Sequence, residues 1–416
     1  MSTHTKKIIK GLKLLKSPKI LVRKLIYKTF FRNVLIKFPS QNTILEELEL
    51  LFKQSQGRKI FVFPGPSCPW GYMFQRPQQL ARSLANLGYT VIYLVDLSFP
   101  YSPDWNVRGL KKVQDNIYLY NDNMQGQLLI KSITQYKINN IVVWQYWPHQ
   151  HNFVKKLPNY VTKIYDCIDH INTFNNYENI YEDFKESLID ADLVLATAKK
   201  ILAETKNIRA DCYLIPNGVH FEDFNIFYNK QYPSNWGHLA VAKKENKYIV
   251  GYYGAIADWF DFEAVNYMAV KNPNCIFLLV GEVYPSVEDK IKQLKNNSNV
   301  VILPRVTYSQ IPQLLSFFDV AMIPFKLNDI TLNTSPVKVY EYMAGGKLTI
   351  ASNMPEINNM SAVLIASSVE DFDKKLKLAL TRLKDPFLRD EMQRIAQANT
   401  WNDRIREVLC LLNQRL

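Results

Sequence analysis

The sequence predicts an α/β protein with two similar halves, each containing a parallel β-sheet covered by helices on both faces. From Arg58 onward, short apolar runs alternate with amphipathic segments, and a polar stretch rich in Pro, Asn and Gly interrupts this pattern near Gly218. The alternation then begins again at Tyr248. Short strands that are apolar on both faces are typical of a parallel sheet buried between helices.

In the first half, the expected strands are separated by helices such as residues 76–87. These strands are 59–63, 90–95, 117–120, 141–145, 163–166, 193–197 and 212–215. In the second half the expected strands are 248–253, 275–280, 300–303, 320–323 and 348–351. Ligands of open parallel sheets bind beyond the carboxyl ends of the strands, so two such halves facing each other would form a central cleft.

The 416 residues are enough for two or three domains, each with its own core. We expect an N-terminal Rossmann-like domain at 46–218, a C-terminal one at 219–396, and a C-terminal helix at 397–416 that packs back towards the first domain. Residues 1–45 form a separate extension in this division.

Composition and cysteine spacing exclude several protein classes. No apolar run approaches the roughly 20 residues of a membrane-spanning helix. The five cysteines lie far apart without a C-x-x-C pair, which argues against a disulfide framework and a zinc module. The N-terminus lacks the continuous apolar region of a secretory signal. We therefore expect reduced thiols and a cytoplasmic protein.

Most of the net charge of +13 lies at the N-terminus. Residues 1–40 hold eleven Lys and Arg and no acid, whereas the rest carries 40 basic and 38 acidic residues. This balance argues against a nucleic-acid surface on the folded domains. Residues 19–37 have the apolar spacing of an amphipathic helix, which could pack on its own domain, bind an anionic membrane surface or bind RNA. We favour the membrane surface, reached through residues 1–40.

The most informative segment is 333–346, with the sequence NTSPVKVYEYMAGG. Thr334 or Ser335 can cap a helix whose first residue is Pro336. The free N–H groups at the start of such a helix favour a diphosphate, and Glu341 could accept hydrogen bonds from ribose hydroxyls. The alternative is an ordinary capped helix with Lys338 and Glu341 solvated.

At this segment the sequence resembles retaining glycosyltransferases of the GT-B fold, family four, especially those of bacterial surface-polysaccharide assembly, such as teichuronic acid, capsule and lipopolysaccharide enzymes. The resemblance covers roughly residues 58–416. Its motifs are FQRPQQL at 74–80, YDCID at 165–169, IPNGV at 215–219, GYYGAI at 251–256, FDVAMIPF at 318–325 and EYMA at 341–344. It implies a nucleotide-sugar donor held by the C-terminal half, an acceptor held by the N-terminal half, and no cofactor.

The resemblance also implies donor-binding positions, with two departures from the family pattern. The expected donor-binding residues are Gly254, Arg305, Val306, Lys326, Thr334, Ser335, Pro336 and Glu341. Asn333 stands where the family has the first of two glutamates, so the donor-sugar contact would come from Asn333, Asn328 or Asp329. The loop 254–261 lacks the family's Arg and Lys, and we expect Lys338 to supply that charge to the diphosphate.

On the acceptor side, the expected residues are Gly71, Arg76, His149 and His170. Asp169 follows a strand end and could orient an acceptor hydroxyl, or simply cap the chain. Arg76 could likewise approach an anion or only fix the start of its helix. Asp169, Asn333 and Lys338 are the expected catalytic residues.

No metal site is expected. Asp190-x-Asp192 looks like a metal-binding D-x-D motif but lies at a helix-to-strand junction, where Asp commonly turns the chain. His149-x-His151 has no Cys or acidic residue nearby in the sequence to complete a ligand set.

The first hypothesis is a metal-independent hexosyl-type glycosyltransferase at the inner face of the plasma membrane, with a lipid-linked or oligosaccharide acceptor. The alternatives are a GT-B-like nucleotide-sugar epimerase and a non-catalytic nucleotide-sugar-binding or scaffold subunit. Asn333 and the missing loop cations motivate the scaffold alternative.

Overall fold

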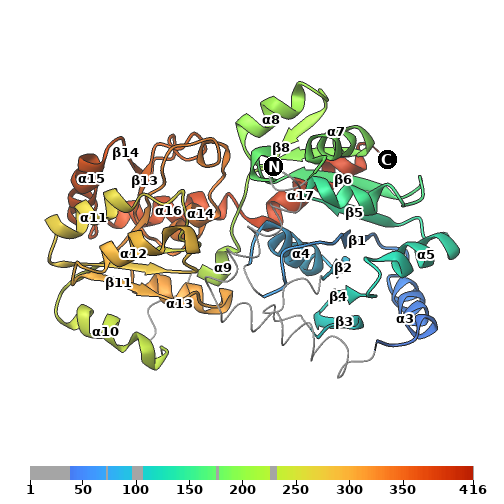
Figure 1. Ribbon diagram of the computed structural model, residues 1–416, viewed down its shortest axis with the longest axis horizontal. Coiled ribbons are helices and arrows are strands. Elements are labelled where there is room, and N and C mark those ends of the chain that lie inside the picture. Colours follow the sequence, from blue (N-terminus) through green and yellow to red (C-terminus); the bar gives the residue numbers. More distant parts are fainter. Residues whose placement is uncertain (1–37, 72–73, 96–105, 175–177, 225–231, 416) are drawn as a thin grey trace, which may run out of the picture. The chain divides into compact units, whose positions relative to one another are not determined.

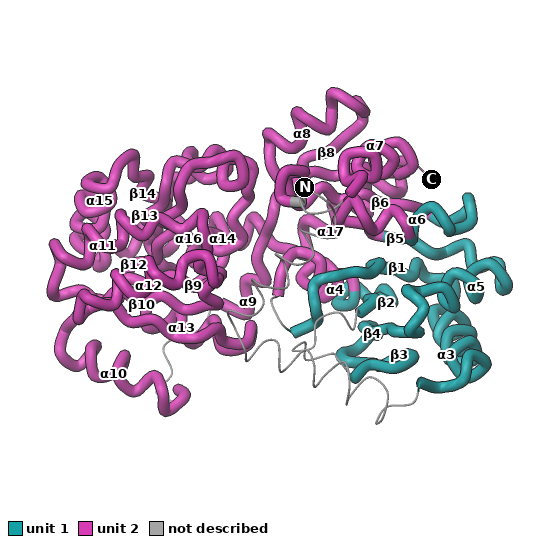
Figure 2. The backbone as a smooth tube through the Cα atoms, viewed as in Figure 1, with its two compact units in different colours: residues 1–73, 85–143, 153–161 teal, residues 74–84, 144–152, 162–416 magenta. Residues whose placement is uncertain are grey.

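The computed structural model describes residues 38–71, 74–95, 106–174, 178–224 and 232–415 (Figure 1). The amphipathic segment 19–37, and with it nearly all of the basic extension, lies outside the described residues. Backbone contacts group the chain into two compact units (Figure 2). Unit 1 comprises residues 1–73, 85–143 and 153–161, and unit 2 comprises residues 74–84, 144–152 and 162–416.

Unit 1 is built on parallel strands. These are β1 (Ile60–Phe63), β2 (Thr90–Leu94), β4 (Ile117–Asn121) and most of β5 (Ile141–Gln145), with β3 (Gly109–Gln114) antiparallel to β4. β1 pairs in parallel with both β2 and β5, and its four residues are buried because they are apolar on both faces.

Helix α3 (Gln41–Gln54) shows how local sequence sets an element of unit 1. The Ser40 side chain caps it by accepting a hydrogen bond from the backbone N–H of Thr43 at 3.1 Å. Its buried residues recur every three to four positions and pack into the core of the unit. They are Ile44, Leu48, Leu51 and Phe52. The other long helix of the unit is α5 (Gln127–Gln135).

Unit 2 contains two sets of parallel strands. The first set is β6 (Thr162–Cys167), β7 (Leu193–Ala196) and β8 (Cys212–Leu214). The second set forms a six-stranded sheet of β9 (Tyr248–Tyr253), β10 (Cys275–Val280), β11 (Val300–Leu303), β12 (Val320–Ile323), β13 (Thr349–Ser352) and β14 (Val363–Ala366). Its strand order is β11-β10-β9-β12-β13-β14.

Helices connect these strands, and those between β9 and the end of α16 surround the six-stranded sheet (Figure 1). They are α4 (Arg76–Asn86), α6 (His151–Val154), α7 (Ile180–Asp190), α8 (Lys199–Lys206), α9 (Phe221–Phe224), α10 (Gly237–Lys244), α11 (Phe262–Lys271), α12 (Glu288–Leu294), α13 (Ile311–Ser316), α14 (Val337–Ala344), α15 (Val369–Thr381), α16 (Pro386–Gln397) and α17 (Trp401–Asn413). None of the helices in the described residues is both long and apolar enough to span a bilayer.

The predicted pair of Rossmann-like, parallel-sheet α/β domains is confirmed, and every expected strand is present within a residue or two. Two strands were not expected. β3 has the sequence GLKKVQ, which shows no apolar pattern because most of its residues are exposed to solvent. β14 has only four residues, two of them half-buried.

Candidate functional site

Helix α14 carries the two charged residues that the sequence singled out, Lys338 and Glu341. The prediction that Pro336 is the first helical residue is wrong: Pro336 is the extended N-cap residue, and the helix begins at Val337. The predicted side-chain cap is also wrong, because the Thr334 hydroxyl donates to the Ile330 carbonyl instead, at 2.7 Å. The N–H groups at the start of α14 therefore lack a side-chain cap.

Glu341 is a buried carboxyl, with 5% of its surface exposed. The Tyr253 hydroxyl, at the end of β9, donates a hydrogen bond to Glu341 Oε2 at 2.7 Å. Burial raises the pKa of Glu341 to about 7, although the Tyr253 hydrogen bond and the charge of Lys338 act in the opposite direction. Glu341 can therefore gain or lose its proton near neutral pH.

Lys338 lies between aromatic rings. Its Nζ is 5.6 Å from the ring centroid of Tyr252 and 5.9 Å from that of Phe325. Burial lowers the pKa of Lys338, and the charge of Glu341 opposes this effect. None of the ion pairs found among the described residues includes Lys338.

Gly254 leaves room for this lysine at the end of β9. Its φ is +136°, and an added Cβ would come within 2.4 Å of Lys338 Cε. A side chain at position 254 would therefore both strain the backbone and displace Lys338. The structure brings Gly254, Lys338 and Glu341 of the predicted donor site together.

Asn333 is almost fully buried, with 2% of its surface exposed. Its Nδ2 donates to the carbonyl oxygen of Asp329, and its Oδ1 has no hydrogen-bond partner within the described part of the chain. The Asn328 side chain accepts hydrogen bonds from Ile330 N and Thr331 N, both at 3.0 Å. These two amides therefore organise the loop before α14.

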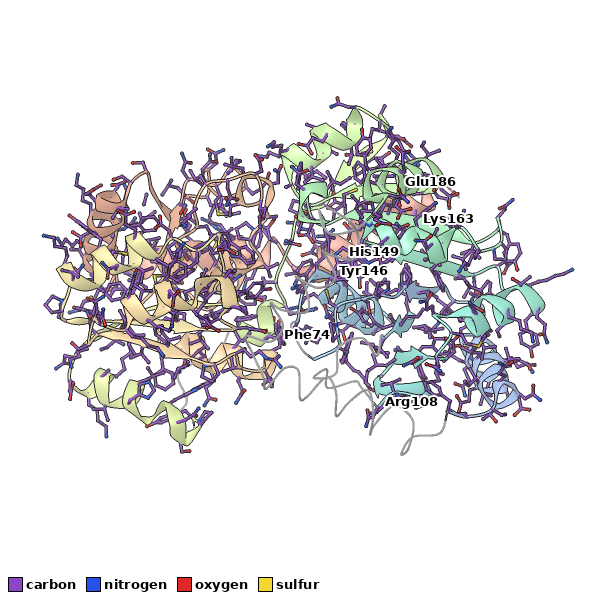
Figure 3. All side chains as sticks on the ribbon, viewed as in Figure 1. Phe74, Arg108, Tyr146, His149, Lys163 and Glu186 are labelled. Carbon is purple, nitrogen blue, oxygen red and sulfur yellow. The ribbon has the colours of Figure 1, made fainter. Side chains whose placement is uncertain are left out.

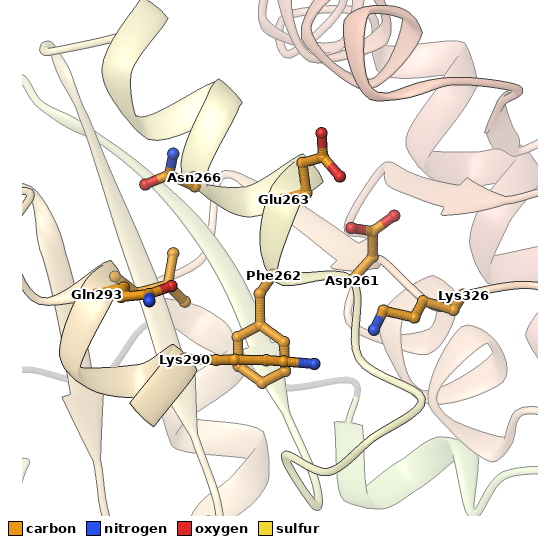
Figure 4. Close-up of a pocket in the computed structure, with 8 residues that line it drawn as sticks. Asp261, Phe262, Glu263, Asn266, Lys290, Gln293 and Lys326 are labelled. Atoms are coloured by element: carbon orange, nitrogen blue, oxygen red, sulfur yellow. The ribbon is translucent and has the colours of Figure 1, made fainter. Parts of the chain in front are cut away.

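Three other expected donor residues, Arg305, Val306 and Lys326, have surroundings different from those of Lys338 and Glu341. Arg305 is exposed after β11, whereas Val306 is half-buried and packs on the core of the six-stranded sheet. Lys326 is exposed and lines a pocket of about 380 Å³ at the start of α11 (Figure 4). The pocket is lined by Asp261, Phe262, Glu263, Asn266, Lys290, Gln293, Leu294 and Lys326. Its two lysines and two acids cancel, so it offers a diphosphate no excess positive charge.

The expected acceptor-side residues have varied surroundings. Gly71 lies in an exposed turn of unit 1 with φ +79°. The His149 ring centroid is 5.5 Å from that of Trp147, and burial lowers the pKa of His149 (Figure 3). His170 accepts a hydrogen bond at Nδ1 from Asn172 N at 3.2 Å, and its Nε2 lies 2.9 Å from Glu204 Oε2. This pairing ties His170 to helix α8.

Asp169 and Arg76 differ in their surroundings. Asp169 follows β6; desolvation by the protein around its carboxyl raises its pKa to about 6, and a hydrogen bond from Trp147 acts in the opposite direction. Arg76 is buried and forms an ion pair with Asp166, with Nε 2.8 Å from Oδ2. Because its guanidinium is already paired with a protein carboxylate, the structure favours a structural role for Arg76 over binding of an anion.

The D-x-D sequence has a structural explanation. Lys163 Nζ lies 2.7 Å from Asp190 Oδ1, and Lys163 N donates to Asp192 Oδ2 at 2.8 Å. Both carboxylates therefore hold the junction of α7 and β7 against β6. Across the described residues, no group of three or more His, Cys, Asp or Glu is placed to hold a metal ion.

Comparison with known proteins gives matches in sequence and structure. Residues 248–382 match the family model described as glycosyl transferases group 1. The chain is 23% identical over 265 residues to a Bacillus subtilis protein described as a teichuronic acid biosynthesis glycosyltransferase, TuaH. This alignment covers 59% of the chain and 65%, just under two thirds, of that relative's length.

Solved structures share the fold at low sequence identity. Sucrose-phosphate synthase from Thermosynechococcus elongatus is 15% identical with a TM-score of 0.63, covering 86% of this chain and 99% of that one. HepE from Anabaena, solved with UDP and glucose, is 15% identical with a TM-score of 0.55, covering 85% and 99%. The family match and the curated relative show that the chain is similar to group 1 glycosyltransferases, and these structures show that it shares the GT-B fold.

Proposed function

We propose that the chain transfers a sugar from a nucleoside diphosphate sugar to a saccharide or lipid-linked acceptor in bacterial surface-polysaccharide synthesis, with retention of anomeric configuration. The observation that carries this proposal is the pairing of Lys338 and Glu341 on one helix, beside Gly254. The cation would face the diphosphate, and the carboxyl would face the ribose. The similarity to TuaH, described as a teichuronic acid biosynthesis glycosyltransferase, and to HepE, solved with UDP and glucose, supports this proposal.

The proposed reaction breaks the bond between the anomeric carbon and the diphosphate oxygen, and forms a bond from that carbon to an acceptor hydroxyl oxygen. Negative charge grows on the departing nucleoside diphosphate. Lys338 and the uncapped N–H groups of α14 would stabilise this charge. The acceptor hydroxyl passes its proton to an oxygen of the departing diphosphate in the same process.

Asp169 is our proposed residue for orienting the acceptor hydroxyl. Its pKa of about 6 leaves it mostly ionised at pH 7, so it can accept a hydrogen bond from that hydroxyl. No metal ion or cofactor is part of the proposed mechanism. We further propose that the basic residues of 1–40 hold the protein at the anionic inner face of the plasma membrane.

The buried amide of Asn333 favours a second candidate, a nucleotide-sugar-binding subunit without turnover. Asn333 lacks the charge of the family glutamate, and its Nδ2 is already bonded to the Asp329 carbonyl. Such a subunit would still bind the donor through α14.

The test is a panel of nucleoside diphosphate sugars, with release of nucleoside diphosphate followed with and without saccharide acceptors. Acceptor-dependent release supports the transferase. Binding without turnover would support the non-catalytic subunit, and a change in the sugar without acceptor would indicate an epimerase. Absence of both binding and turnover would contradict the proposed function.

A further inference from the structure

A buried chain of hydrogen bonds in unit 2 leads to the start of α14. Arg76 binds both carboxylate oxygens of Asp166, with Nε to Oδ2 at 2.8 Å and Nη2 to Oδ1 at 3.1 Å. Its Nη1 donates to Asn217 Oδ1 at 3.1 Å, and Asn217 Nδ2 donates to the Ser335 carbonyl at 2.6 Å. All four residues are buried. The chain thus joins α4, β6 and the segment after β8 to the residue preceding the N-cap of α14.

The ion pair fixes the orientation of Arg76. Asp166 also accepts a hydrogen bond from Trp144 Nε1 at 3.1 Å, so its carboxylate receives donors from two sides. A planar guanidinium held at two points has little rotational freedom. The position of its remaining nitrogen, Nη1, is therefore fixed. This nitrogen donates to the Pro216 carbonyl at 3.2 Å as well as to Asn217 Oδ1.

The orientation of the Asn217 amide follows from this arrangement. Because Arg76 only donates, the oxygen of the amide must face it, and the NH₂ group must then face the Ser335 carbonyl. An aspartate in this position could still accept from Arg76. It could not donate to Ser335.

The backbone around Asn217 is also held tightly. Arg404 Nε donates to the Asn217 carbonyl at 3.4 Å. At the next residue, Gly218, an added Cβ would come within 2.8 Å of the Asn399 carbonyl oxygen. The backbone of Asn217 is therefore restrained, and its side chain holds the Ser335 carbonyl through a hydrogen bond.

Ser335 lies three residues before Lys338 and six before Glu341. Since α14 has no side-chain cap of its own, the bond from Asn217 is a side-chain restraint on the approach to this helix. We infer that Asn217 is a positioning residue, which sets the placement of Lys338 and Glu341 for a nucleoside diphosphate without touching that ligand. This inference rests on the proposed function of the same site.

The experiment measures the affinity of the full chain for UDP, GDP, ADP and dTDP by calorimetry, using wild type, Asn217→Asp and Asn299→Asp. Asn299 is a matched control because its Nδ2 also donates to backbone carbonyls, those of Ala269, Asn272 and Cys275. We expect Asn217→Asp to weaken the best-bound nucleotide about fivefold to tenfold, the range for one lost hydrogen bond. Asn299→Asp should lower Tm without changing this affinity.

A double-mutant cycle separates positioning from general destabilisation. If Asn217 acts through α14, the effects of Asn217→Asp and Lys338→Gln on affinity should be less than additive, whereas a merely structural role predicts additivity. If Asn217→Asp does not fold, Arg76→Lys replaces it, because lysine keeps the charge beside Asp166 but lacks the second branch. Wild-type affinity in the folded variant, or full additivity, would overturn the inference while leaving the proposed function intact. Failure of the wild type to bind any of the four nucleotides would overturn both.

Discussion

The side chain of Glu341 is the clearest place to perturb the proposed donor site. Glu341→Gln keeps the volume and an Oε that can accept from the Tyr253 hydroxyl, so the fold should persist. It removes the charge and one acceptor oxygen. A hydrogen bond to a charged group contributes about 1.5–3 kcal/mol. At 1.36 kcal/mol per tenfold change, kcat/KM for the donor should fall about 10-fold to 150-fold.

The pKa of Glu341 adds a pH signature to this variant. Its carboxyl has a pKa of about 7 in the free protein, so it is mostly protonated at pH 6 and mostly ionised at pH 8. In the ionised form Oε1 carries no proton and can accept from ribose hydroxyls, while Oε2 accepts from the Tyr253 hydroxyl. Donor KM of the wild type should therefore fall as pH rises from 6 to 8, and Glu341→Gln should show a flatter profile.

Steady-state donor kinetics at pH 6, 7 and 8 provide the assay. Glu288→Gln serves as the control, because Glu288 is an exposed carboxylate at the start of α12. A wild-type donor KM in Glu341→Gln at pH 8, together with an unchanged pH profile, would refute the assignment of Glu341 to the ribose.

Three further predictions concern charge. Lys338→Gln should lower kcat/KM about 10-fold or more, because it removes the cation that faces the diphosphate, and a matched Lys326→Gln should change it less; equal losses in steady-state kinetics would contradict this ranking. Turnover should persist in excess EDTA, and a loss that Mg²⁺ or Mn²⁺ restores would disprove metal independence. Replacing the eleven Lys and Arg of residues 1–40 with Gln should abolish sedimentation with anionic vesicles, since each basic residue near such a surface contributes about 1 kcal/mol; binding that survives would refute the membrane role of this segment.

The stability of the free protein should also depend on Glu341. Its folded pKa of about 7 lies above the ordinary value of 4.5, so the folded state holds its proton more tightly than the unfolded state does. The corresponding stability is present below about pH 4.5 and is lost as pH rises through 7. Chemical denaturation should therefore show Glu341→Gln gaining stability relative to the wild type over this range, and a constant difference would contradict the raised pKa.

The parallel strands could be predicted from sequence because strands such as 60–63 and 275–280 are apolar on both faces, a pattern that depends on no distant partner. β3 escaped prediction because its polar residues face solvent at the edge of the sheet. The start of α14 was misplaced by one residue, since Pro is compatible with both the N-cap and the first helical position.

Side-chain partners were the least predictable feature. Arg76 was expected on the acceptor side, but it pairs with Asp166, 90 residues away in the sequence. Asn217 and Ser335 are separated by 118 residues, and no local pattern links them. Glu341 and Lys338 could be found because they share one short motif, whereas the pKa of Glu341 depends on burial and on Tyr253 from β9.

A structure of the full chain with a bound nucleoside diphosphate tests the central claim most directly. The account predicts that the diphosphate lies within hydrogen-bond distance of Lys338 Nζ and the start of α14, with a ribose hydroxyl donating to Glu341. A nucleotide bound elsewhere, for example in the pocket between α11 and α12, with Lys338 and Glu341 untouched, would contradict it.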